Sequence, residues 1–285
     1  MAEGNADSDS PPISDGGVSP ESEGFSGAPD DEEMPLTEHI REMIQRLLVV
    51  LFVMGAVSAV MFIIPNPSRP FADRAVEFLW YSFLDVGGND PEACVQAGAD
   101  ATACPRVYHP LGLILTRLKV ASLAGFIIAL PVFVYETYLF MRPGLYPKER
   151  RYYLASVPTS LVLALVGVAF AYFLILPIIF SYFLYYSQDV ATIAFGLQET
   201  FDMILLMMGL FAAVFQIPLF IMLAIMMGIT TRHWLEQRRL LFWASFGGVA
   251  FLFSPDPTGM APVLVAVTMI ALFELTLLLL RWTGR

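Results

Sequence analysis

An acidic side chain, Glu149, lies among basic residues in the segment FMRPGLYPKERR, residues 140–151. Long apolar stretches flank this segment, so we expect a short charged turn at a membrane surface. A carboxylate there can accept paired hydrogen bonds from a guanidinium group, which favours an arginine-bearing peptide as ligand. Phe140, and Glu42 ahead of the first apolar stretch, would lie on the same face. Alternatively, Glu149 only pairs with Lys148, Arg150 or Arg151, and the residues taken alone favour this second interpretation.

Patterns typical of hydrolases and metal sites are missing from the sequence. The three histidines, His39, His109 and His233, fall near three different membrane boundaries and on both faces, so they cannot jointly bind a metal or form a triad. Nucleophile-elbow, zinc-protease, phosphate-loop and dinucleotide motifs are also missing. We therefore predict a protein that is not an enzyme, that has no catalytic residues, metal or cofactor, and that does not bind nucleic acid.

Two polar residues fall deep inside apolar stretches. Gln216 is next to Pro218, and Glu274 lies in the middle of the last stretch. Polar groups are costly in hydrocarbon and need a partner or a use. They either form hydrogen bonds between helices or make a polar patch for a substrate or partner helix, and the sequence favours neither.

The composition indicates an integral membrane protein. Hydrophobic residues make up 57% of the 285 residues and charged residues only 15%, with a mean hydropathy of +0.66. Residues 1–33 hold ten acidic residues and no Lys or Arg, among many Ser, Pro and Gly. We expect this segment to be a disordered cytoplasmic tail, either a solvating one that suits a high-salt cytoplasm or a partner-binding arm. Residues 34–285 would form the membrane domain.

Six apolar runs can cross the membrane as helices. A span of ~30 Å of hydrocarbon needs about 20 helical residues, and five runs reach that length. The sixth run, 240–253, would extend only about 21 Å, and the turn SPDPTG joins it directly to the last run. The five long runs are near 44–64, 113–139, 154–179, 203–227 and 260–280.

An even number of spans places both ends of the chain on one side of the membrane. Of the 16 Lys and Arg residues, 11 fall in the turns and flanks on the side of the termini, and 5 fall in residues 66–119. This bias predicts cytoplasmic termini. Residues 65–111 would form the main external loop, where Cys94 and Cys104 lie on the oxidising side. A disulfide between them is favoured over two free thiols.

Prolines lie inside or at the ends of most of the expected spans. Each proline removes a backbone donor and bends its helix. The expected fold is therefore an all-α membrane protein with six transmembrane helices in a bent, concave bundle, in which the fifth and sixth helices are short. The prolines concerned are Pro131, Pro158, Pro177, Pro218 and Pro262.

Several segments, in a fixed order, resemble the TatC family of the twin-arginine protein translocase. They are YETYLFMRPGLYPKERR, VGVAFAYFLILP, FQIP, MGIT, SPDP and ALFE, and the resemblance extends over roughly residues 34–282. It implies six spans with cytoplasmic ends, in a multi-pass protein of the cell membrane. It also implies a receptor that binds the twin-arginine signal peptides of folded proteins. Such a receptor recruits single-span TatA-type subunits for export driven by the proton-motive force, and further TatC copies can join it. The acidic tail adds a halophilic archaeal host to these expectations.

The resemblance assigns a signal-binding role to five residues. Glu149 matches the recognition acid of the first cytoplasmic loop, and Phe140 matches the aromatic residue before that loop's turn, which contains Pro143. Glu42 and Arg46 match the polar entry of the first span.

The resemblance also implies a partner-helix contact and an external turn. Gln216, beside Pro218, matches the polar site that faces the partner helix, and Asp256 matches the acid between the last two spans. The chain departs from the family pattern where Ile44 replaces a common Arg, Gln216 a common Glu, and Glu136 a usual Gln. The competing class is a small-solute transporter, which would need paired repeats and an ion site at the membrane midplane.

Overall fold

The computed structural model describes residues 36–64, 66, 70–83, 106–187, 196–254 and 259–282, and this part of the chain is almost entirely helical. The acidic tail, the segment with Cys94 and Cys104, and Asp256 lie outside these residues, so the expectations for them stay predictions. The helices are α1 (Leu36–Ile63), α2 (Phe71–Phe83), α4 (Gly112–Met141), α5 (Pro147–Phe170), α6 (Leu176–Ser187), α7 (Leu197–Val214), α8 (Ile217–Met226), α9 (Arg232–Gln237), α10 (Arg239–Phe253) and α11 (Met260–Trp282), with the short turns η2 (Arg142–Gly144) and η3 (Ala171–Ile175).

The helices confirm the positions of the apolar spans. Five helical stretches, Ile40–Ile63, Gly112–Met141, Glu149–Tyr185, Leu197–Met226 and Met260–Trp282, are long and apolar enough to cross a membrane. The expected short fifth span is α10, with 15 residues. The expectation of a short sixth helix was wrong, because α11 has 23 residues. The apolar run after Met260 has no break before Trp282, so the helix continues through it.

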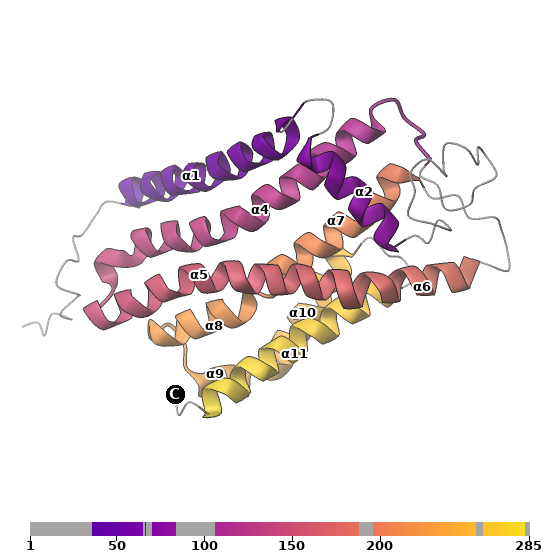
Figure 1. Ribbon diagram of the computed structural model, residues 1–285. Helices are drawn as coiled ribbons and strands as arrows, with labels where there is room; N and C mark the ends of the chain where they lie inside the picture. Colours follow the sequence, from indigo (N-terminus) through magenta and orange to yellow (C-terminus); the bar gives the residue numbers. More distant parts are fainter. Residues whose placement is uncertain are drawn as a thin grey trace, which may run out of the picture.

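All spans run roughly along one direction, and their ends form two clusters (Figure 1). The start of α1, the α4–α5 turn, α9 and the end of α11 lie at one end, which we call the Glu149 end. Helix α2 and the starts of α4 and α7 lie at the opposite end, which we call the α2 end. Both ends of the described chain are thus on one side of the bundle, as an even number of spans requires. Which side is cytoplasmic stays a prediction from the charge bias.

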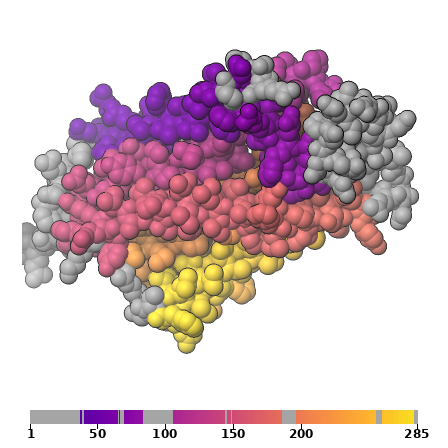
Figure 2. Space-filling view, in the orientation of Figure 1, coloured from indigo at the N-terminus to yellow at the C-terminus, as the bar shows by residue number. Residues whose placement is uncertain are grey.

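Helix α7 forms the centre of the core. Phe201, Ile204, Met207 and Phe211 on this helix are each 0 to 1% exposed. Helix α1, in contrast, is peripheral and packs mainly against α4. Figure 2 shows α1, α4 and α5 beside one another across one face of the molecule, with α2 lying over one end.

Two glycines allow neighbouring helices to approach closely. A Cβ atom at Gly125 of α4 would lie 2.5 Å from the carbonyl oxygen of Met54 on α1. A Cβ atom at Gly167 of α5 would lie 2.4 Å from the carbonyl oxygen of Phe211 on α7. Small residues at such contacts are typical of membrane helix packing, because they let backbones meet.

Two of the five prolines coincide with irregular backbone. The fourth span is broken between α7 and α8, where Pro218 follows Gln216 in the first turn of α8. The third span widens into the π-helical turn η3 just before Pro177, which moves the carbonyl away from the proline ring. Pro131 and Pro158 lie inside α4 and α5, whose helical assignment continues through them.

Helix α2 is an element that the sequence analysis missed, because 13 residues are too few to cross a membrane. It buries Ala72, Val76, Leu79 and Trp80 against the bundle, a spacing typical of an amphipathic helix. A salt bridge of 2.7 Å between Asp73 and Arg117 joins it to α4. The guanidinium of Arg117, near the start of α4, thus has an acid of this missed helix as its partner.

Candidate functional site

The charged turn between α4 and α5 is held in place by a buried anchor. Leu145 follows η2, which contains Pro143, and its side chain is only 4% exposed. Leu145 belongs to a small cluster in the core with Val134, Tyr153, Leu219 and Leu223. Because this anchor fixes the middle of the turn, the residues that follow it start α5 in a defined position.

Glu149 occupies the third position of α5 and closes its first turn. Its carboxylate oxygen Oε2 accepts a hydrogen bond of 3.0 Å from the backbone N–H of Tyr146. An acid at this position also interacts favourably with the helix dipole. Within the described residues, Glu149 takes part in no salt bridge, and its second oxygen, Oε1, has no hydrogen-bond partner there.

The expected alternative for Glu149 was an ion pair with Lys148, Arg150 or Arg151. The salt bridges of the described residues do not join it to Arg150 or Arg151, and the side chain of Lys148 lies outside those residues. Arg150 instead donates from Nε to the backbone oxygen of Leu145, at 3.1 Å. The structure therefore adds a role in helix capping to the predicted recognition role, and among the described residues one carboxylate oxygen has no partner.

Glu42 and Arg46 form one cluster with Glu136, which connects α1 to α4. The guanidinium of Arg46 lies 2.5 Å from a carboxylate oxygen of Glu42 and 3.2 Å from one of Glu136. The three side chains are 15 to 29% exposed, so water screens them only in part. Two carboxylates share one guanidinium, which leaves one negative charge in excess.

Phe140 and Ile44 also lie on the helices that form the Glu149 end. Phe140 lies in the last turn of α4 and is half-buried, and Ile44 on α1 is 49% exposed. The start of α1 and the α4–α5 turn are at the same end of the bundle (Figure 1). The structure thus brings Glu42, Phe140 and Glu149 to one end, as the sequence predicted.

Gln216 is enclosed in the bundle, at 2% exposure. Its Nε2 donates to the carbonyl oxygens of Ser160 on α5 at 3.1 Å and of Ala212 at 3.3 Å. This arrangement confirms the hydrogen bonding between helices that was one of the two interpretations. Its Oε1 is buried and has no hydrogen-bond partner within the described part of the chain. In this conformation the side chain does not reach the lipid-facing surface, so a partner contact at Gln216 and Pro218 stays a prediction.

Glu274 also forms contacts between helices. Its carboxylate lies 3.4 Å from the guanidinium of Arg239 and accepts a hydrogen bond of 3.3 Å from Trp243 Nε1. Both partners are on α10, so the acid joins the last two helices near the Glu149 end. This contact supports the structural interpretation of Glu274.

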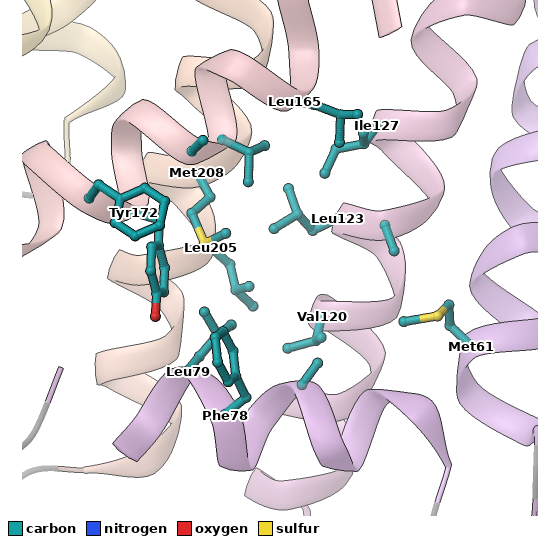
Figure 3. Close-up of a pocket in the computed structure, with 15 residues that line it drawn as sticks. Met61, Phe78, Leu79, Val120, Leu123, Ile127, Leu165, Tyr172, Leu205 and Met208 are labelled. Carbon is teal, nitrogen blue, oxygen red and sulfur yellow. The ribbon is translucent and has the colours of Figure 1, made fainter. Parts of the chain in front are cut away.

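An apolar cavity of about 420 Å³ lies in the other half of the bundle (Figure 3). Residues from α1, α2, α4, α5, η3 and α7 line it, including Met61, Phe78, Leu123, Leu165, Tyr172 and Met208. It was not identified from the sequence, because its walls come from segments that are far apart along the chain. The amphipathic pattern of α2 was the one available signal.

The TatC family of Sec-independent protein translocase proteins matches residues 38–267 of this chain. The chain is 58% identical to the TatCo protein of Haloferax volcanii over 89% of its own length, and it spans 58% of that relative's length. It is 32% identical to the TatC protein of Methanocella arvoryzae, across 89% of this chain and 96% of the relative. A crystal structure of the twin-arginine translocase receptor TatC shares the fold, with a TM-score of 0.68 and 23% identity over 87% of this chain and all of that one. This multi-pass membrane protein therefore belongs to the TatC family of Sec-independent protein translocase proteins.

Proposed function

We propose that this chain is the membrane receptor and core subunit of a twin-arginine translocation system. It binds the twin-arginine signal peptides of folded proteins and recruits single-span TatA-type subunits for export driven by the proton-motive force. The protein lies in the cell membrane with both termini in the cytoplasm, so the Glu149 end faces the cargo. The observation that carries the proposal is the carboxylate of Glu149, whose Oε1 has no hydrogen-bond partner among the described residues, at the end of the bundle where Glu42 and Glu136 also lie.

The two arginines of a signal meet acidic groups on three helices, α5 for one guanidinium and α1 with α4 for the other. One guanidinium binds Glu149 at Oε1, which has no partner among the described residues, while Oε2 keeps its bond to the N–H of Tyr146. The other guanidinium binds the cluster of Glu42, Arg46 and Glu136, where the carboxylates outnumber the cation. Arginine suits both sites because its planar donors bind carboxylates in pairs, whereas lysine is a point charge. Arg46 holds the two carboxylates in place, and Phe140 and Pro143 contribute the shape of the turn.

The apolar stretch of the signal extends along the bundle to the cavity in Figure 3. Leu165 in the cavity wall is 16 residues beyond Glu149 on the same helical span. At 1.5 Å per residue, this separation corresponds to about 24 Å. A helical apolar stretch of about 16 residues would thus reach from the acidic end to the cavity. Charge would provide specificity and apolar burial would provide affinity.

Recruitment of a single-span partner is assigned to the fourth span. The buried Oε1 of Gln216 lacks a hydrogen-bond donor within the described residues, and a polar residue on a partner helix could supply one. Access requires a local movement, and the broken helix at Pro218 is the place where α7 and α8 can separate. Asp256, in the turn between α10 and α11, remains a candidate contact on the opposite side of the membrane.

Photo-crosslinking in membranes tests the receptor function. A photoreactive residue is placed at Phe140 or Glu149 in the full chain, and a radiolabelled twin-arginine signal peptide is added. A twin-lysine peptide is the ligand control, and the same photoreactive residue at Glu199, in the first turn of α7 at the α2 end, is the position control. We expect crosslinks from the first two positions that depend on the arginine pair. Equal labelling by both peptides, or labelling from Glu199 alone, would refute the proposed site.

A further inference from the structure

A second cavity lies at the Glu149 end, away from the acidic cluster. It has a volume of about 500 Å³ and is formed where α8 ends, α9 follows and α10 begins. Phe220, Ala224, Trp234 and Phe242 provide much of its apolar lining, and Thr230 also lines it. None of these residues belongs to the signal-binding site proposed above.

The walls of this cavity are fixed by contacts with the rest of the bundle. The ring of Phe242 stacks on that of Phe273 in α11, with a centroid distance of 5.1 Å. Trp234 meets the ring of Phe242 edge-on at 6.2 Å. Leu235, which follows Trp234 in the chain, is 4% exposed and packs in the same core cluster as Phe273. The cavity is therefore largely preformed, as binding sites for small apolar groups usually are.

A positively charged side chain lies against one residue of the cavity wall. The guanidinium of Arg238 lies 4.8 Å from the centre of the Trp234 ring, and within the described residues it makes no salt bridge. Its basic neighbours are already paired, Arg232 with Glu236 at 3.3 Å and Arg239 with Glu274 at 3.4 Å. Among these three arginines, Arg238 is thus the one without an acidic partner in the described part of the chain.

A polar atom of a residue in the cavity wall also lacks a partner. The hydroxyl oxygen of Thr230 is buried and forms no hydrogen bond with any described residue. A buried hydroxyl without a partner is unfavourable, because it loses its bonds to water. Because this oxygen has almost no accessible surface, a ligand in the cavity reaches it only after the Thr230 side chain rotates, and an oxygen atom of the ligand would then remove the penalty.

We propose that this cavity binds an anionic phospholipid. One acyl chain enters among Phe220, Trp234 and Phe242, and the phosphate lies against Arg238. The Thr230 side chain rotates towards the ligand, and its hydroxyl donates to an oxygen near the glycerol. The cavity is at the level where α8 ends and α10 starts, which is the depth of lipid headgroups in a bilayer. The apolar walls match a chain, the arginine at the rim matches the phosphate, and the lone hydroxyl matches the polar junction between them.

Quenching of tryptophan fluorescence by brominated lipids tests this site. The full chain is reconstituted in nanodiscs of neutral lipid and titrated with phosphatidylglycerol that carries bromine on its acyl chains. Brominated phosphatidylcholine is the headgroup control, and the signal lost in Trp234→Phe reports the quenching of Trp234 itself. We expect saturable quenching by phosphatidylglycerol at low mole fraction and weak quenching by phosphatidylcholine.

Substitutions then separate the parts of the site. Arg238→Gln should weaken phosphatidylglycerol binding about fivefold, which is the contribution of one basic residue near an anionic lipid surface. Arg281→Gln, at the end of α11 and outside the cavity lining, is the matched control and should leave binding unchanged. Ala224→Leu fills the cavity and should abolish the saturable component. Thr230→Val, which keeps the shape of the side chain, should weaken binding without lowering the midpoint of thermal unfolding.

Three results would overturn the proposal. The first is equal quenching by the two brominated lipids. The second is equal loss of affinity in Arg238→Gln and Arg281→Gln, which would reduce the effect to general surface charge. The third is full competition by inorganic phosphate, which would indicate an anion site with no lipid specificity. Signal-peptide binding is measured separately, so failure of this site and failure of the proposed receptor function can be distinguished.

Discussion

Replacing Glu149 with Gln separates the two roles that the structure gives to this side chain. The oxygen of a Gln side chain can still accept the hydrogen bond from Tyr146 that Glu149 Oε2 accepts at 3.0 Å, because Gln also serves at this position of a capping box. The substitution therefore keeps the geometry of the turn and removes only the negative charge. A purely structural carboxylate would be replaced at little cost.

The size of each effect follows from the environment of the carboxylate. Loss of the favourable interaction with the helix dipole should lower the free energy of unfolding by about 0.5 kcal/mol. A hydrogen bond from a guanidinium to a carboxylate is worth about 1.5 to 3 kcal/mol when well shielded. Because Glu149 is only half-buried, the lower end applies, and the dissociation constant of a twin-arginine signal should rise about tenfold.

Glu199→Gln is the matched control for this experiment. Glu199 is likewise an acid in the first turn of a helix, α7, but it lies at the α2 end of the bundle. Signal-peptide binding is measured by fluorescence anisotropy on purified protein, and stability by thermal unfolding of the same samples. Both variants should lose a similar, small amount of stability, and only Glu149→Gln should lose affinity. If Glu149→Gln bound the signal as tightly as the parent chain, the carboxylate would act only as a helix cap and the recognition role would be refuted.

Three further predictions concern the packing of the bundle. Arg46→Gln leaves the carboxylates of the cluster without their cation and should lower the free energy of unfolding by about 2 kcal/mol. Adding Glu136→Gln to this variant should recover about 1 kcal/mol. Thermal unfolding of both variants measures these changes, and the absence of any recovery would argue against the salt bridge between Arg46 and Glu136. Gly167→Leu inserts a side chain where even a Cβ atom would meet the backbone of α7, and it should lower the free energy of unfolding by about 3 kcal/mol or more. Gly55→Leu is the control and should change the free energy of unfolding little in the same assay, because no atom lies within 4 Å of its Cβ position. Gln216→Leu removes a buried amide whose N–H group donates to two carbonyls and whose oxygen has no partner among the described residues. The free energy of unfolding should therefore change by about 1 kcal/mol or less. Crosslinking to a single-span partner should fall while signal binding stays intact, and loss of both would indicate misfolding.

Much of the fold could be predicted because hydropathy is a local property of the chain. Apolar runs of about 20 residues cannot remain in water, and in lipid they must be helical to satisfy their backbone groups. The runs expected near 113–139 and 260–280 correspond to α4 and α11 with only small shifts at their ends. The expected short span 240–253 is α10 almost residue for residue. Helix α2 was missed because it is amphipathic and short, so its burial depends on the neighbours that cover one face.

The candidate site was predictable only in part. The turn with Glu149 could be recognised because an acid among bases between two spans is visible in the sequence. The capping bond to Tyr146 follows from the position of an acid at the third residue after a helix start, a signal that was present and not used. The bridge from Arg46 to Glu136 joins residues 90 positions apart, and no spacing rule connects them.

The sequence by itself determined that this chain crosses a membrane, where it does so, and which charged turn lies between the second and third spans. These features follow from the transfer free energy of side chains and the length of a helix, which act over neighbouring residues. Only the tertiary structure decided that Arg46 holds two acids from different helices, that Gln216 is enclosed, and that α2 helps to form an apolar cavity. These features depend on which helix faces lie against each other, and close contacts such as Gly125 with α1 and Gly167 with α7 set those faces. The physical reason is that packing in lipid is selected by complementary shape and hydrogen bonding between distant segments, because hydrophobicity does not distinguish one apolar face from another.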